Sequence, residues 1–188
     1  MSHGARTLAV RRPGVPLVEV RLRIPFAAPS GKRGAAHAAQ AQLLADSMLL
    51  GTASRDASRL AQDLQSLGGQ LSVSADADRL GMSGSVLAGQ LPAFLELLGE
   101  LLTSAAYPRD EVAGERDRLV QELAIYRSQP SAIAREALLA RMYRSHPYGR
   151  DLPSADDIAL VRPKQLRALH AARVGPRQAV LTLVGDLS

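Results

Sequence analysis

Residues 18–24 have the sequence VEVRLRI, in which every second residue is apolar and the others are Glu or Arg. Successive side chains of a β-strand point to opposite faces, so this period of two predicts a strand with one buried face. Residues 7–10 are also apolar, and Pro13-Gly14, between the two runs, is a turn signal. We therefore expect residues 7–24 to form a β-hairpin.

The same alternation recurs further along the chain. Apolar residues alternate with Ser and Asp in residues 71–76, and a similar run occupies residues 80–86. These two runs predict a second hairpin, weakened by Gly81 and Gly84. Residues 179–184 are mostly apolar and predict one more strand near the end of the chain.

Other apolar residues recur at helical spacing and indicate six helices. Ser54 is a possible N-cap for the second of them. Runs of hairpins combined with runs of helices favour an α+β domain, in which a mainly antiparallel β-sheet packs against α-helices. We expect residues 1–188 to form a single domain. The expected helices span residues 35–50, 57–67, 92–102, 109–127, 131–144 and 163–173.

Composition narrows the possible chemistry. The chain has no cysteine, which excludes disulfides, thiolate catalysis and cysteine zinc sites. No apolar run has the length of a signal peptide core or a membrane span, so we expect no membrane partner and leave cytoplasm and periplasm both open. The net charge is +5, yet the arginines are spread along the chain, often beside Asp or Glu. A solvated basic surface explains this better than nucleic-acid binding.

The order of elements and several short strings resemble the M16 family, also called the pitrilysin, insulinase or mitochondrial processing peptidase family. The resemblance covers nearly the whole chain and implies a domain of that family's α+β fold. The strings are residues 47–52 (SMLLGT), Leu67-Gly68-Gly69, Tyr107-Pro108, His146-Pro147-Tyr148-Gly149 and Val184-Gly185-Asp186.

Active members of that family carry an inverted zinc motif, His-x-x-Glu-His, and a third ligand, Glu, on a later helix. Aligning on Gly51-Thr52 places the first histidine at Gln42, the glutamate at Ala45 and the second histidine at Asp46. The third ligand falls at Glu122, in a string that begins at Glu115. The resemblance therefore implies an inactive homologue that has kept one outlying ligand position and has no catalytic residue and no bound cofactor.

The residue types support this interpretation. Catalytic zinc in hydrolases has three protein ligands, commonly two imidazoles and a carboxylate, whereas Gln42, Asp46 and Glu122 offer only oxygen. Ala45 cannot take a proton from a metal-bound water. Because the partner ligands are missing, Glu115 and Glu122 are better explained as exposed helix carboxylates paired with a nearby arginine. We expect the four histidines to be surface or capping residues: His3, His37, His146 and His170.

The resemblance further implies that this domain is part of a longer two-domain subunit and works beside a homologous M16 subunit or domain that carries zinc. The pair, a homo- or hetero-oligomer, would enclose an extended peptide that adds a strand to a sheet edge. Two other functions stay open. One is a metallopeptidase that uses Gln42, Asp46 and Glu122 as a non-standard metal set. The other is a basic scaffold for an acidic partner or nucleic acid.

Overall fold

The computed structural model describes residues 4–29 and 32–187. Five strands form one sheet in the order β1-β5-β2-β4-β3. Neighbouring strands run antiparallel except β1 and β5, which are parallel. The predicted α+β class with a mainly antiparallel sheet is confirmed. The strands are β1 (Arg6–Arg11), β2 (Leu17–Pro25), β3 (Gln70–Ala75), β4 (Arg79–Leu87) and β5 (Val180–Gly185).

The expected hairpin over residues 7–24 is wrong, because β5 lies between β1 and β2 and pairs with both. The two strands exist, but they are separated by two strand spacings, about 9–10 Å. The five residues 12–16 can span roughly 16 Å when extended, so the connection reaches across β5 without strain. The second hairpin is confirmed, with β3 and β4 paired antiparallel.

All six expected helices are present, and the short helix α6 was not expected. The bounds of α4 and α7 are as predicted, and the ends of the other four differ from the prediction by at most three residues. The N-cap of α2 is Asp56 and not Ser54, since Asp56 Oδ1 accepts a hydrogen bond of 2.7 Å from the backbone N–H of Arg59. The helices are α1 (Lys32–Ser47), α2 (Ala57–Ser66), α3 (Leu91–Ser104), α4 (Arg109–Arg127), α5 (Pro130–Tyr143), α6 (Ala155–Ala159) and α7 (Pro163–Arg173), with short 3-10 turns η1 (Ala88–Gln90) and η2 (Pro147–Gly149).

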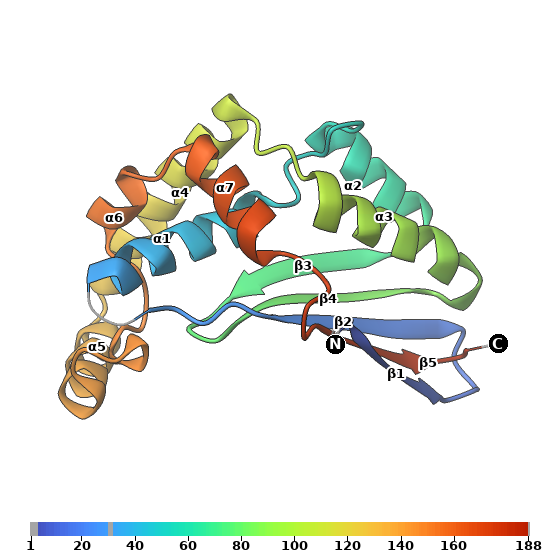
Figure 1. The fold of residues 1–188 in the computed structure, drawn as a ribbon, viewed down its shortest axis with the longest axis horizontal. Helices are drawn as coiled ribbons and strands as arrows, with labels where there is room; N and C mark the ends of the chain where they lie inside the picture. The colour runs from blue at the N-terminus through green and yellow to red at the C-terminus, as the bar shows by residue number, and fades with distance from the viewer. Residues whose placement is uncertain (1–3, 30–31, 188) are drawn as a thin grey trace.

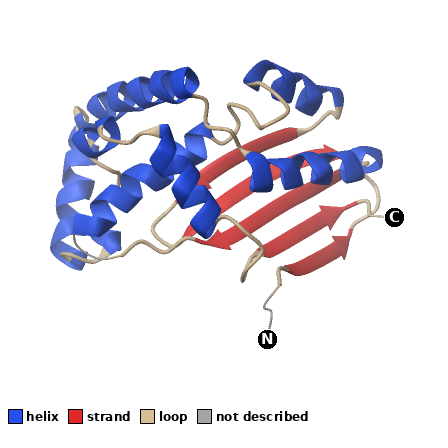
Figure 2. Ribbon diagram, turned by 45° about the horizontal axis from the view of Figure 1, so that its top comes forward, coloured by secondary structure: helices blue, strands red, loops and turns tan. Residues whose placement is uncertain are grey.

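The helices gather on one side of the sheet, and the other sheet face is left open (Figures 1 and 2). Residues of β2 alternate strictly between buried and exposed, which is the pattern of a sheet covered on one face. Helices α2 and α3 lie over the sheet, α1 packs against α4, α6, α7 and β3, and α5 projects at one end with η2 (Figure 1). No helix of the described residues is both long and apolar enough to cross a lipid bilayer.

Candidate functional site

Helices α1 and α4 bring most of the sequence-predicted site residues to one seam. Gln42 and Asp46 lie one turn apart on α1, and both are half-buried. The side-chain amide of Gln42 donates hydrogen bonds to both carboxylate oxygens of Asp46, at 3.2 and 3.0 Å. Ala45, which the resemblance relates to the family's glutamate, is 2% exposed within the core. The seam therefore presents a satisfied amide–carboxylate pair on its α1 side.

On the α4 side, the guanidinium of Arg118 links two carboxylates. Its Nε donates to Glu115 Oε2 at 2.9 Å, Nη2 donates to Glu115 Oε1, and Nη1 donates to Glu122 Oε1. The three residues are three and four positions apart, so one helix face holds them together. Sequence reasoning expected an arginine beside these carboxylates but did not identify Arg118 as a bridge between both of them.

The charges on the two sides of the seam act on Asp46. Burial raises the pKa of Asp46, while the hydrogen bonds from Gln42 lower it. Repulsion from Glu115 raises it further, Arg118 lowers it and Glu122 raises it. The same carboxylates that the resemblance relates to a metal site are thus electrostatic neighbours, and their positive counter-charge is a guanidinium.

These residues do not fit a catalytic zinc ion. Such a site needs three well-placed ligands, usually imidazoles and a carboxylate, and an open position for water. Here the amide of Gln42 is bonded to Asp46, and Glu115 and Glu122 are bonded to Arg118. Within residues 4–29 and 32–187, no group of three or more His, Asp or Glu side chains is placed to hold a metal ion.

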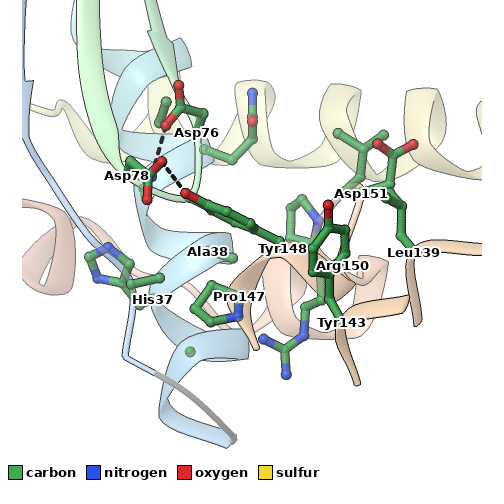
Figure 3. A pocket seen from close by; sticks show the side chains of 18 of the residues that line it. His37, Ala38, Asp76, Asp78, Leu139, Tyr143, Pro147, Tyr148, Arg150 and Asp151 are labelled. Atoms are coloured by element: carbon green, nitrogen blue, oxygen red, sulfur yellow. Dashed lines mark hydrogen bonds between the residues drawn. The ribbon is translucent and has the colours of Figure 1, made fainter. Parts of the chain in front are cut away.

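A cavity of about 420 Å³ opens beside Gln42, between α1, the β3–β4 turn and the arm formed by α5 and η2. Its rim is closed by a hydrogen bond from Tyr148 Oη to Asp78 Oδ2, at 2.6 Å (Figure 3). Asp76 orders the turn by accepting the backbone N–H groups of Asp78 and Arg79 at 2.8 and 2.9 Å. The lining combines small apolar residues of α1 with aromatic and charged residues of the arm.

Strand β3 leads into this cavity. It lies at the edge of the sheet, and Ala75 and Asp76, at its carboxyl end, line the cavity wall. An edge strand carries a row of backbone N–H and C=O groups that can pair with another extended chain. The carboxyl end of this edge strand therefore lies at the cavity wall, and an exposed sheet edge is one mode by which domains bind extended peptides.

Two histidines expected at the surface are buried. Nε2 of His37 lies 3.0 Å from the carbonyl oxygen of Phe26, and burial lowers the pKa of His37. His170 lies between Tyr107 and Leu102, with its Nδ1 2.8 Å from Tyr107 Oη and its Nε2 3.0 Å from the Leu102 carbonyl oxygen. Apolar packing from distant elements buries both rings, which a local pattern does not reveal.

Of the remaining two histidines, the structure describes only His146, and this residue is as predicted. His146 is the expected capping residue, because its Nδ1 accepts the backbone N–H of Tyr148 at 3.3 Å and begins η2. His3 lies outside the described residues. None of the three described histidines stands in the α1–α4 seam.

A mixed five-stranded sheet covered by helices on one face, with α1 packed against both α4 and the edge strand β3, defines an α+β domain. The chain belongs to the insulinase family, peptidase family M16, whose model matches residues 26–156. The fold is shared with the peptidase M16 inactive domain from Pseudomonas fluorescens, which is 29% identical with a TM-score of 0.86. A protease from Helicobacter pylori has the same fold, at 21% identity and a TM-score of 0.86 over 99% of this chain.

The relatives are longer than this chain. An uncharacterized zinc protease from Mycobacterium tuberculosis is 26% identical over 159 residues, which is 84% of this chain but 36% of that protein. The match to the Pseudomonas structure covers 100% of this chain and 45% of that chain. The match to the Helicobacter protease covers 99% of this chain and 45% of that chain. The chain thus spans less than half of these proteins.

Proposed function

We propose that this chain is a non-catalytic M16 domain that helps an active zinc-bearing homologue to bind extended peptides. One observation carries the proposal. The α1–α4 seam has neither imidazole ligands nor a general base, yet it lies next to an edge strand and a cavity. The family resemblance relates Gln42, Ala45 and Asp46 to the positions where active members have their two imidazoles and their general base. Beside them lie the edge strand β3 and the cavity, which are the surfaces that this proposal assigns to the peptide.

The chemistry of hydrolysis supports a non-catalytic role. Peptide hydrolysis in this family's manner requires a Lewis acid and a base that takes a proton from its bound water. A methyl group at Ala45 accepts no proton, and its side chain is buried in the core. The ion pairs of Arg118 already satisfy the carboxylates of Glu115 and Glu122. A metal bound by chance at this seam would still lack the base.

Peptide binding is supported by the edge of β3. Backbone hydrogen bonds to an edge strand give affinity without sequence preference, and a neighbouring cavity selects side chains. The cavity floor is formed by Ala38 and Ala41 of α1, and its rim is formed by Tyr148 and Asp78. The similarity to a Pseudomonas domain described as inactive agrees with a role in binding alone.

We further propose that the domain works inside a longer two-domain subunit and alongside a homologous M16 subunit. The support is length: the match covers 45% of the Pseudomonas chain and 36% of the mycobacterial protein, so these relatives have room for a second domain of this size. The cytoplasm and the periplasm are both compatible with a chain that has no cysteine.

The test is reconstitution with a homologue that has an intact His-x-x-Glu-His helix. Hydrolysis of a mixture of fluorogenic peptides is measured for the full protein that contains this chain, for the homologue and for both together. We expect chelator-sensitive hydrolysis from the mixture and none from this protein alone. Chelator-sensitive cleavage by this protein alone contradicts the proposal, as does an unchanged rate when it is added to the homologue.

A pair of matched variants tests the peptide surface. Ala38→Phe fills the cavity, and we expect it to lower kcat/KM of the mixture while the complex still assembles. Ala171→Phe, on an exposed position of α7, is the control and should leave kcat/KM unchanged. Equal rates for the two variants would remove the cavity from the proposal but leave the loss of hydrolytic groups intact.

A further inference from the structure

Helix α5 has its apolar side turned outward. Of its 14 residues only Ala132 is buried. Ile133, Leu138 and Met142 are 58%, 56% and 60% exposed, far more than large apolar side chains of a surface helix usually are. Two rows with four-residue spacing make up the exposed face: Ile133, Ala137 and Arg141 in one, and Ala134, Leu138 and Met142 in the other.

The inward side of α5 is held to the body by polar contacts. Glu136 accepts a hydrogen bond from Arg127 Nε at 2.9 Å, and Arg135 Nε donates to Asp151 at 2.7 Å. Helix α5 packs against α4 and η2 and projects from one end of the molecule (Figure 1). A helix that adds little to the core yet carries an apolar outer face is suited to packing against another helix. Rows at i and i+4 are the ridges that such packing uses.

The unpaired charges at this face are positive. Arg141 is the last residue of the first row and Arg144 is the C-cap of the helix, and neither forms an ion pair with any other described residue. The nearby carboxylates are already engaged, Glu122 by Arg118 and Glu136 by Arg127. A partner that covers this face therefore gains most by presenting carboxylates.

A second copy of this chain fits the face poorly. It would bring its own unpaired Arg141 and Arg144 to the contact. We propose that the outward face of α5 docks an amphipathic helix of a partner protein, with that helix's carboxylates beside Arg141 and Arg144. This goes beyond the proposed function, because it does not require the partner to be a peptidase.

The experiment uses two labelled helical peptides with the same leucine stripe, one with glutamates and one with lysines flanking the stripe. Fluorescence anisotropy measures their binding to the protein. We expect the glutamate peptide to bind at least about tenfold more tightly than the lysine peptide, with the preference falling as salt rises. Arg141→Glu should reverse the preference, and Leu138→Ser should weaken binding of the glutamate peptide by at least about tenfold.

Leu160→Ser is the matched control, because Leu160 is a leucine outside α5 that is 69% exposed, even more than Leu138. It should leave binding unchanged, and circular dichroism should show that all three variants are folded. Equal affinity for the two peptides, no binding of either, or an unaffected Leu138→Ser protein would overturn the proposal. Sedimentation as a dimer that Leu138→Ser converts to a monomer would also overturn it, in favour of a second copy.

Discussion

Helices α1 and α3 are both buried, but by opposite chemistry. Helix α3 buries Phe94 and three leucines against the sheet, and all of its buried residues are apolar and lie on one face. Helix α1 buries Leu43, Leu44 and small residues, and it also takes polar groups into the interior. The Ser47 hydroxyl is fully buried without a hydrogen-bond partner among the described residues, and Asp46 is half-buried.

The comparison shows that apolar packing accounts for the buried residues of α3 but not for all of those in α1. Every buried residue of α3 improves stability, as expected of a helix selected for the core. Buried polar groups without full compensation destabilise a fold, and such departures from local rules concentrate at functional sites. In α1 they fall at and next to Gln42, Ala45 and Asp46, the positions that the family resemblance relates to zinc. Measured stability of variants in α3, in α1 and in the α4 residues that act on Asp46 tests this comparison.

The largest expected effect is in α3. Leu101 is fully buried, so Leu101→Ala should lower the free energy of unfolding by about 2–5 kcal/mol, through lost burial and the cavity left behind. Urea unfolding followed by circular dichroism measures the change. Leu95→Ala, at a half-buried position of the same helix, is the control and should lose clearly less. Equal losses would mean that α3 is not the packed helix described above.

The next effect has the opposite sign and lies in α1. Ser47→Ala removes a buried hydroxyl that has no partner among the described residues, so it should raise the free energy of unfolding by about 1 kcal/mol. The same urea experiment measures it. Ser104→Ala is a useful comparison, because Ser104 Oγ donates to the Glu100 carbonyl oxygen at 2.8 Å. A destabilised Ser47→Ala protein would show that the hydroxyl is hydrogen-bonded in solution.

A smaller gain is expected from Asp46→Asn, and it should depend on pH. Burial raises the pKa of Asp46 in the folded state, so the folded protein holds this proton more tightly than the unfolded chain does. The stability that this proton contributes is present below the unfolded pKa, roughly 3.9, and is lost as pH rises through the folded pKa.

Asn cannot ionise, so Asp46→Asn should be more stable than the wild type at pH 7, and the gain should vanish near pH 3. Thermal melts of both proteins across this range measure the difference. Asp56→Asn serves as a control for a surface carboxylate that caps α2. A constant difference at every pH would show that the buried charge is not the cause.

Most of the fold could be predicted from the sequence because its elements carry local signals. The alternation in residues 18–24 and the helical spacing of α3 each identify an element without its neighbours. The insertion of β5 between β1 and β2 could not be predicted, because strand order is set by pairing between residues far apart in sequence. The burial of His37 and His170 depends on similar long-range packing.

The site divides along the same line. The absence of imidazoles at Gln42 and Asp46 is visible in the sequence, and so is the spacing of Glu115 and Glu122. Several arginines lie close to Glu115 and Glu122 in the sequence, and the sequence does not say which of them pairs with the carboxylates. The structure shows that Arg118 forms ion pairs with both. Likewise, the apolar rows of α5 are visible in the sequence, but their outward direction depends on how the arm packs against α4.

The smallest expected effect tests the ion pairs on the α4 side of the seam. Arg118 is half-exposed, so its pairs with Glu115 and Glu122 are screened by water, and Arg118→Met should lower the free energy of unfolding by at most about 1 kcal/mol. The loss should exist because Glu115, only 13% exposed, is left near Asp46 without its counter-charge. It should shrink in 1 M salt, which urea unfolding at two salt concentrations measures. Arg116→Met, which breaks a pair with the adjacent and exposed Asp117, should change nothing. If Arg118→Met were more stable than the wild type, the ion pairs of Arg118 with Glu115 and Glu122 would not stabilise the fold.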